Sequence, residues 1–234
     1  MKKKVFIICG TVILILGMIF IYIASAYRAE DIAKEYLIST KKVKVSETDF
    51  GWYFDGPSEE YALCFYPGAK VEEIAYAPLL FRLAESGMDV CLVDMPLNLA
   101  LLGVNKADSV IEAFDYSHWY VGGHSLGGAM SAIYASKRGK NIDGVILCAA
   151  YPTRKLDDNL EEIVIYGSED KIMDIDNLEK SIKYAPEDHT EYVIEGGNHS
   201  QFGNYGFQAG DGNAFISAAD QQSETIQVIL DEVR

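Results

Sequence analysis

The sequence predicts an α/β fold in which a mostly parallel, doubly wound sheet has helices on both faces. Short apolar, β-prone runs alternate along the chain with segments whose apolar residues recur at helical spacing. Residues 61–66 and 88–93 are apolar almost throughout, as strands buried on both faces are. Residues 118–130 form a third signal, an apolar strand that passes through a glycine-bounded turn into a helix. Buried strands that alternate with helices are typical of a parallel sheet.

The composition fits one globular domain with an N-terminal addition. The chain has 234 residues, of which 49% are hydrophobic and 24% are charged, so it can bury one sizeable core. Its net charge is −15, and without the lysines at positions 2 to 4 the rest of the chain has 17 basic and 35 acidic residues. Such an acidic body repels nucleic acid and anionic membrane surfaces, so we expect no nucleic-acid partner.

The four cysteines predict neither a disulfide framework nor a metal centre. Cys9 lies in the N-terminal apolar run, and Cys64, Cys91 and Cys148 each lie inside a predicted buried strand. The sequence has no C-x-x-C pair and no His/Cys cluster with metal spacing, and three thiols in the body cannot pair completely. We therefore expect the cysteines to act as small hydrophobes, and we expect no cofactor and no metal.

The N-terminal segment predicts a membrane anchor. Three lysines precede residues 5–26, which carry no charge. At a rise of 1.5 Å per residue, about 22 residues span roughly 33 Å, which is enough to cross a bilayer core. Lysines favour the inside of the membrane, so the sequence predicts a single-pass protein of the cell membrane with its folded domain on the extracytoplasmic side.

A secretory signal peptide is the alternative for this segment. Ala24-Ser25-Ala26 has the small-x-small form of a cleavage site, and cleavage near Ala26 would give a secreted protein. The apolar run exceeds the usual signal-peptide core of about 7–15 residues, which favours the anchor. We therefore divide the chain into an anchor or uncleaved signal (1–27), a juxtamembrane amphipathic helix (28–42) and a folded domain (43–234).

The folded domain has strand and helix signals in regular order. Strands are predicted over 43–47, 51–54, 61–66, 88–93, 144–150, 162–166 and 192–194. Pro78 opens a helix that Gly87 closes, and a short helix over 107–114 leads to the strand that begins at His118. A last helix has an apolar face made by Phe215, Ala219, Gln222, Ile226, Ile229 and Val233. About ten residues separate the strand that ends near 150 from the strand that begins near 162, which is too few for a large lid.

The turn between the strand from His118 and the following helix contains the motif G-x-S-x-G, with Ser125 at its centre. A serine here sits at the tip of a tight turn, where its hydroxyl projects beside the first N–H groups of the helix. Gly123 and Gly127 are required because a side chain at either position would collide with a neighbouring strand or helix.

The sequence resembles α/β-hydrolases in this motif, in Phe65–Val71 and in two later turns at 167–171 and 195–200. The resemblance is closest to the small, lidless, dienelactone-hydrolase-like kind, and it covers most of the chain from Tyr61 onward. It implies an α/β-hydrolase fold whose opening strands are antiparallel, and it implies a serine hydrolase that is most often an esterase.

The resemblance also assigns candidate site residues. Ser125 matches the nucleophile, Asp170 the acid and His199 the base, in the chain order Ser, Asp, His. Glu169 is the neighbour that could take the place of Asp170. The two oxyanion donors would be the backbone N–H groups of Leu126 and Ala69.

The assignment of Ala69 is the more open of the two. Pro67 has no N–H, and Gly68 lets the backbone turn inward, so Ala69 is the first plausible donor. Many related sequences carry His-Gly at this place, and Pro67-Gly68 is a departure from that pattern.

The sequence therefore predicts a serine hydrolase that cleaves carboxylic esters through an acyl-enzyme intermediate. Its substrate would be a small-molecule or surface-presented ester, because an open site without a lid favours such esters. The alternatives are an acyltransferase or amidase with the same triad, and a non-catalytic, hydrolase-like extracellular binding module. The oligomeric state is left open.

Overall fold

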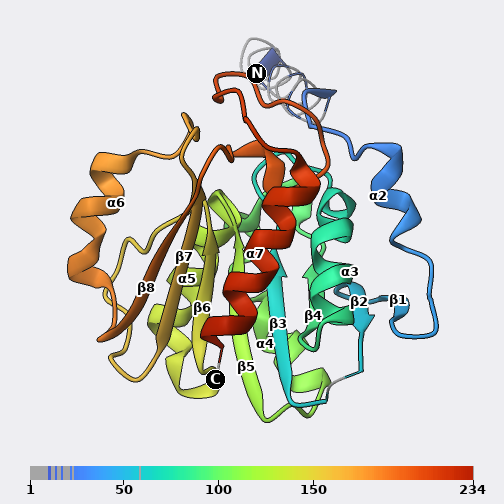
Figure 1. Ribbon diagram of the computed structural model, residues 1–234, viewed down its shortest axis with the longest axis vertical. Coiled ribbons are helices and arrows are strands. Elements are labelled where there is room, and N and C mark those ends of the chain that lie inside the picture. Colours follow the sequence, from blue (N-terminus) through green and yellow to red (C-terminus); the bar gives the residue numbers. More distant parts are fainter. Residues whose placement is uncertain are drawn as a thin grey trace, which may run out of the picture.

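The computed structural model describes residues 10, 11, 14, 17, 22, 24–57 and 59–233. Its framework is an eight-stranded sheet in the order β1-β2-β4-β3-β5-β6-β7-β8 (Figure 1). β2 pairs antiparallel with β1 and β4, and the neighbouring strands from β4 to β8 pair parallel. The sheet thus has the antiparallel opening and the parallel remainder that the resemblance implies.

The strands lie close to their predicted positions. They are β1 (Lys44–Thr48), β2 (Gly51–Asp55), β3 (Tyr61–Tyr66), β4 (Asp89–Val93), β5 (His118–His124), β6 (Gly144–Cys148), β7 (Glu161–Gly167) and β8 (Asp188–Ile194). β4 and β6 are buried at every residue, in agreement with their apolar sequences. β8 differs from the prediction of a last core strand, because it forms the edge of the sheet and its Tyr192 and Val193 are each 37% exposed.

Helices cover both faces of the sheet and make two separate cores. The helices are α2 (Asp31–Glu35), α3 (Ala77–Glu85), α4 (Lys106–Ala113), α5 (Leu126–Arg138), α6 (Ile175–Ser181) and α7 (Ala218–Glu232). α3 and α7 pack on one face, and α4, α5 and α6 contribute apolar side chains to the core on the other face (Figure 1). Phe215 precedes α7 and is 80% exposed, so it does not belong to the buried face predicted for that helix.

The segment before the sheet packs on the domain. The helix expected over 28–42 is present as the five residues of α2, whose Ala33 is buried and which contacts α3. Most of the predicted anchor, residues 5–26, lies outside the described residues, and so does Cys9 within it. Among the residues that are described, none of the helices has both the length and the apolar character needed to span a bilayer.

Two further predictions concern the interior and the lid. Cys64, Cys91 and Cys148 are free and buried, and burial raises the pKa of the Cys148 thiol to about 12. The connection between β6 and β7, residues 149–160, contains no helix, so no lid helix is inserted there. The carboxyl ends of the parallel strands and the loops that follow them are therefore open on this side.

Candidate active site

Ser125 lies at a sharp turn between β5 and α5. Its φ of 54° and ψ of −123° are strained for a residue with a side chain, as expected where a strand folds directly back into a helix. Two glycines make the turn possible, because a Cβ on Gly127 or Gly123 would lie 2.2 or 2.4 Å from the carbonyl oxygen of Tyr66. The local sequence therefore fixes the position of the serine at the carboxyl edge of the sheet.

The substitution Gly127→Ala is expected to lower the free energy of unfolding by about 3 kcal/mol, because the added methyl group meets backbone rather than a flexible side chain. Gly139→Ala is the matched control. A Cβ there meets side chains and no backbone within 4 Å among the three nearest atoms, with Leu160 Cδ1 at 3.3 Å and Asp157 Cβ at 3.5 Å, and we expect a change within about 0.5 kcal/mol. Urea unfolding of both variants measures the difference, and equal stabilities would contradict the steric account.

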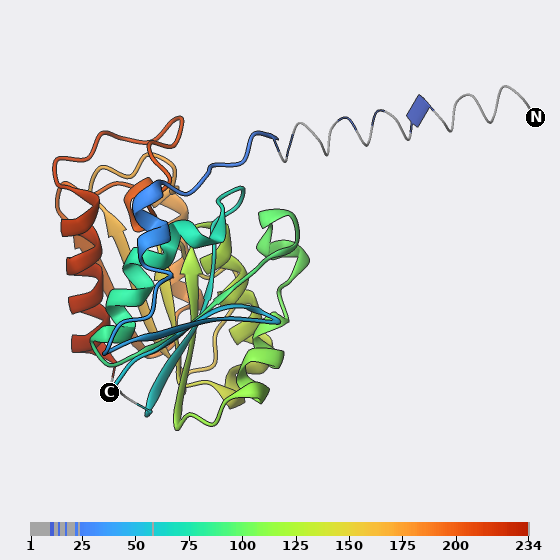
Figure 2. The ribbon, with the colours of Figure 1, turned by 90° about the vertical axis from the view of Figure 1, so that its right-hand side faces the viewer.

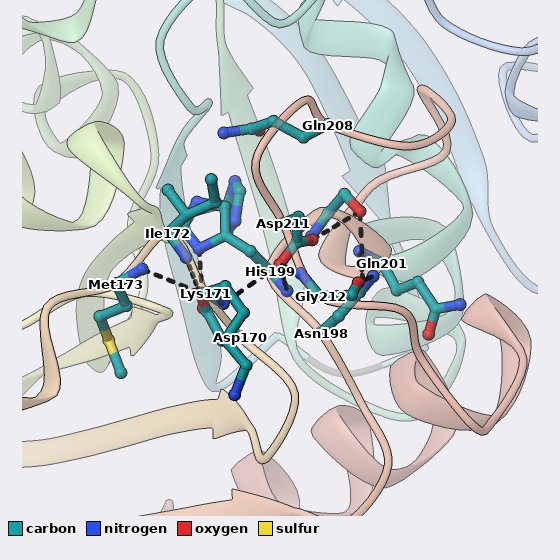
Figure 3. A network of polar contacts seen from close by, with 12 residues as sticks. Asp170, Lys171, Ile172, Met173, Asn198, His199, Gln201, Gln208, Asp211 and Gly212 are labelled. Atoms are coloured by element: carbon teal, nitrogen blue, oxygen red, sulfur yellow. Dashed lines mark hydrogen bonds and ion pairs between the residues drawn. The ribbon is translucent and has the colours of Figure 1, made fainter.

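Asp170 and His199 form a buried hydrogen-bonded pair (Figure 3). His199 Nδ1 lies 2.7 Å from Asp170 Oδ2, while Asp170 Oδ1 accepts the backbone N–H groups of Ile172 and Met173, each at 2.8 Å. The carboxylate is thus fixed by both oxygens, so it orients the imidazole with Nδ1–H toward it. The other ring nitrogen, Nε2, is buried and has no hydrogen-bond partner among the described residues.

Ser125 and His199 face the same pocket of about 330 Å³. Most of its other lining residues are apolar or small. The full set of these others is Leu126, Ala129, Ala149, Ala150, Tyr151, Thr153, Ile172, Met173 and Asp174. Glu169 does not line it, and the Glu169 side chain interacts with the Ser168 hydroxyl at 3.3 Å. Of the two neighbouring acids, Asp170 is therefore the one that contacts the histidine.

The two predicted oxyanion donors lie on adjacent backbone segments. Leu126 is the first residue of α5, so its N–H has no carbonyl one helical turn earlier to bind. Ala69 lies between two anchored residues, because Gly68 N–H donates to Tyr76 Oη at 3.0 Å and Lys70 N–H donates to the Asn98 carbonyl at 2.9 Å. The loop before Ala69 touches the start of α5, where a Cβ on Gly127 would meet the Pro67 carbonyl oxygen at 2.4 Å.

Tyr76 and His124 support this loop, and no local sequence pattern indicates that they contact each other. Tyr76 Oη accepts from Gly68 N–H and also forms a hydrogen bond of 2.8 Å with His124 Nδ1. Burial, and to a lesser degree the neighbouring His199, hold the pKa of His124 well below its ordinary value. His124 is therefore neutral, and its ring packs against that of His199 with centroids 4.5 Å apart.

Asp211 supports the loop that carries His199 and was not identified from the sequence. One carboxylate oxygen accepts the N–H and the hydroxyl of Ser200, both at 2.9 Å, and the other accepts the N–H of His199 at 3.3 Å and of Lys171 at 3.4 Å. These bonds join the turn that carries Asp170 to the loop that carries His199, and Figure 3 shows Asp211 in one polar network with both residues. In the sequence it is marked only by its position between Gly210 and Gly212.

Comparison with solved structures shows the same architecture in other hydrolases. Dienelactone hydrolase from Anabaena variabilis matches with a TM-score of 0.61 and 12% identity over 82% of this chain and 100% of that chain. Carboxyl esterase 2 from Tuber melanosporum matches with a TM-score of 0.59 and 12% identity over 89% of this chain and 91% of that chain. At these identities the likeness concerns the fold alone.

The comparison with family models gives the stronger result. A search of curated proteins found no match. The model of the alpha/beta hydrolase family matches residues 62–223, which is well over half of the chain and includes all the parallel strands. The chain therefore belongs to the alpha/beta hydrolase family.

Proposed function

We propose that the protein is a serine hydrolase that cleaves carboxylic esters through an acyl-enzyme intermediate. The observation that carries the proposal is the buried Asp170–His199 pair, whose Nε2 has no hydrogen-bond partner among the described residues, together with the pocket that both His199 and Ser125 line. A serine hydroxyl is a poor nucleophile at neutral pH and needs a base within hydrogen-bond reach. In the proposal His199 is that base and Asp170 is the residue that orients it.

In the acylation step Ser125 Oγ attacks the ester carbonyl carbon and its proton passes to His199 Nε2. Asp170 accepts the Nδ1–H hydrogen bond throughout and stabilises the imidazolium that forms. When the tetrahedral intermediate collapses, the bond to the alkoxide breaks and Nε2 returns the proton to the leaving alcohol. Water then repeats the sequence on the acyl-enzyme, which releases the carboxylic acid and restores the serine.

The negative charge of each tetrahedral intermediate falls on the former carbonyl oxygen. We propose that the N–H groups of Ala69 and Leu126 bind this oxygen, since Leu126 begins α5 and Ala69 lies in the adjacent loop between two residues with anchored N–H groups. The neutral state of His124 supports the role of His199 as the base, because a positive charge beside His199 would oppose the protonation of His199 in the transition state.

The pocket favours a small acyl group. Its volume of about 330 Å³ is at the low end of the range for small-molecule pockets, and its walls include Ala129, Ala149 and Ala150. The connection between β6 and β7 supplies no helical cover over it. Small or surface-presented esters are thus the substrates that we propose.

The direct test is to label the purified full chain with a fluorophosphonate and to measure turnover of a short-chain aryl ester. Labelling together with hydrolysis is the expected result. Transfer of the acyl group to an added alcohol or amine in preference to water would favour the acyltransferase, and cleavage of the matching aryl amide would favour the amidase. A folded protein that neither labels nor turns over ester would contradict the proposal and favour a binding module.

Tyr76→Phe is expected to lower kcat about tenfold with little change in KM, because it frees the Gly68 N–H and loosens the loop that carries Ala69. The matched control is Tyr205→Phe, which removes a second buried phenol hydroxyl that contacts Gln208 and not the loop. Steady-state kinetics of both variants on the aryl ester measures the effect. Equal losses in the two variants would show that the tyrosines act through general packing.

We propose, in addition, that residues 5–26 anchor the protein in the cell membrane with the hydrolase domain on the extracytoplasmic side. The support is the uncharged run itself and the three lysines before it. Resistance of the full chain to alkaline extraction from membranes, with the domain accessible to external protease, is the expected result. Recovery of a soluble chain that begins near Tyr27 would instead indicate a cleaved signal peptide.

A further inference from the structure

The residue that follows the apolar run is fixed beside the proposed oxyanion loop. Tyr27 donates its backbone N–H to the Lys70 carbonyl at 2.7 Å and accepts the N–H of Glu72 at 2.9 Å, so it lies alongside Val71 like a short parallel strand. The run ends at Ala26, and adjacent Cα atoms are about 3.8 Å apart. No free linker therefore separates the end of the run from the site.

The next residues extend this attachment to the loop beyond His199. Ala29 N–H donates to the Glu72 carboxylate at 2.8 Å, and Glu30 N–H donates to the Asn204 carbonyl at 2.8 Å. The Tyr27 side chain also packs against Tyr205, with ring centroids 5.6 Å apart. Figure 2 shows the chain leaving the domain at the edge toward which the parallel strands point.

Exposed apolar side chains gather on loops of this same edge. The loop after β4 carries Leu97, Leu101 and Leu102, of which Leu101 is 59% exposed, and the loop after β8 carries Phe207, which is 57% exposed. The first of these loops is tied to the oxyanion loop through the bond from Lys70 N–H to Asn98. Apolar side chains around an open site are unfavourable in water and favourable at the headgroup boundary of a bilayer.

We propose that the mouth of the active site faces the membrane in which the chain's own N-terminal run is inserted, and that the substrate is an ester carried by an amphiphile of that membrane. This inference rests on the proposed serine hydrolase activity and on the proposed anchor. The acidic body gives no electrostatic attraction to anionic lipid, so the apolar rim and the short attachment at Tyr27 set the orientation. Shared residence in one membrane raises the effective concentration of such an ester at Ser125.

The test compares two aryl esters with the same short acyl group, using the full chain reconstituted in phosphatidylcholine vesicles. One ester is soluble, and the other has a long alkyl chain on its leaving group that keeps it in the bilayer. A rigid helical spacer of about 20 residues, roughly 30 Å long, is inserted between Ala26 and Tyr27. The matched control has the same spacer between Lys140 and Asn141, in the exposed connection from α5 to β6 at the opposite edge of the sheet.

The spacer after Ala26 is expected to lower turnover of the bilayer ester at least tenfold and to leave turnover of the soluble ester unchanged. The control spacer should change neither. Equal turnover of the bilayer ester in both spacer variants would overturn the inference while leaving the hydrolase proposal intact. Failure of the unmodified chain to cleave either ester would instead contradict the proposed function.

A second pair of variants keeps the inference testable if the spacer after Ala26 also impairs the soluble reaction. Replacing Leu101 and Leu102 together by aspartate should lower turnover of the bilayer ester about fivefold or more, with the soluble ester unaffected. Ile182→Asp is the control, since Ile182 is 57% exposed and precedes β8 at the amino edge of the sheet. Loss of bilayer turnover to the same extent in both would overturn the inference.

Discussion

Ser125→Ala is expected to lower ester turnover by on the order of 10⁶ and to abolish labelling by a fluorophosphonate. In the proposed mechanism no other hydroxyl takes over the attack. The strained turn that presents Ser125 is held by Gly123 and Gly127 rather than by the serine side chain, so the fold should survive the change. Because the change to alanine relieves no clash, we expect the thermal unfolding midpoint of the variant to stay within a few degrees of the wild-type value.

Ser131→Ala is the control for the loss of a buried serine near the same site. Ser131 lies on α5 and donates its hydroxyl to the Gly128 carbonyl at 2.8 Å, away from the pocket. This variant should label and turn over ester like the wild type. Residual labelling of Ser125→Ala at the wild-type rate would mean that another residue is the nucleophile.

Asp170→Asn is expected to lower kcat by about 10⁴, with KM nearly unchanged. The amide keeps an oxygen for the N–H groups of Ile172 and Met173, so the turn should persist. Its NH₂ group would donate to His199 Nδ1 and thereby favour the tautomer that carries its proton on Nε2. That tautomer cannot accept the proton of Ser125.

Glu169→Gln is the matched control, because it removes the charge of the adjacent acid, which does not contact His199. Its kcat should stay within about threefold of the wild type. Steady-state kinetics on the aryl ester compares the two variants directly. A larger loss in Glu169→Gln than in Asp170→Asn would reverse the assignment of the acid.

The features that sequence could predict are those that depend on a few neighbouring residues. The turn at Ser125 is one example, because Gly123 and Gly127 are demanded by contacts with the Tyr66 carbonyl and stand two residues on either side of the serine. The buried strands are another, since continuous apolar runs such as β6 identify themselves. Together they place Ser125 directly after a buried strand, at the edge of the sheet where the candidate site lies.

The features that escaped prediction depend on distant partners. Tyr76 and His124 are 48 positions apart, and Asp211 is 40 positions from Lys171, so no local pattern announces their contacts. The exposure of Tyr192 and Val193 at the sheet edge also escaped prediction, because both side chains are apolar enough for a core strand. The choice of Asp170 over Glu169 is different, because the resemblance already favoured Asp170, and the contact with His199 Nδ1 agrees with that choice.

The bonds of Asp211 also bear on how this family member could diversify. Asp211 closes a loop from residues 201 to 210 by binding Ser200 and His199 at its start, so the His199 backbone is held by the two ends of the loop, whatever the loop's length. Doubling the length of such a closed loop costs only about 0.6 kcal/mol in chain entropy. Insertions or exchanges between residues 201 and 210 could therefore change the surface beside the candidate site, while the His199 ring stays where it is.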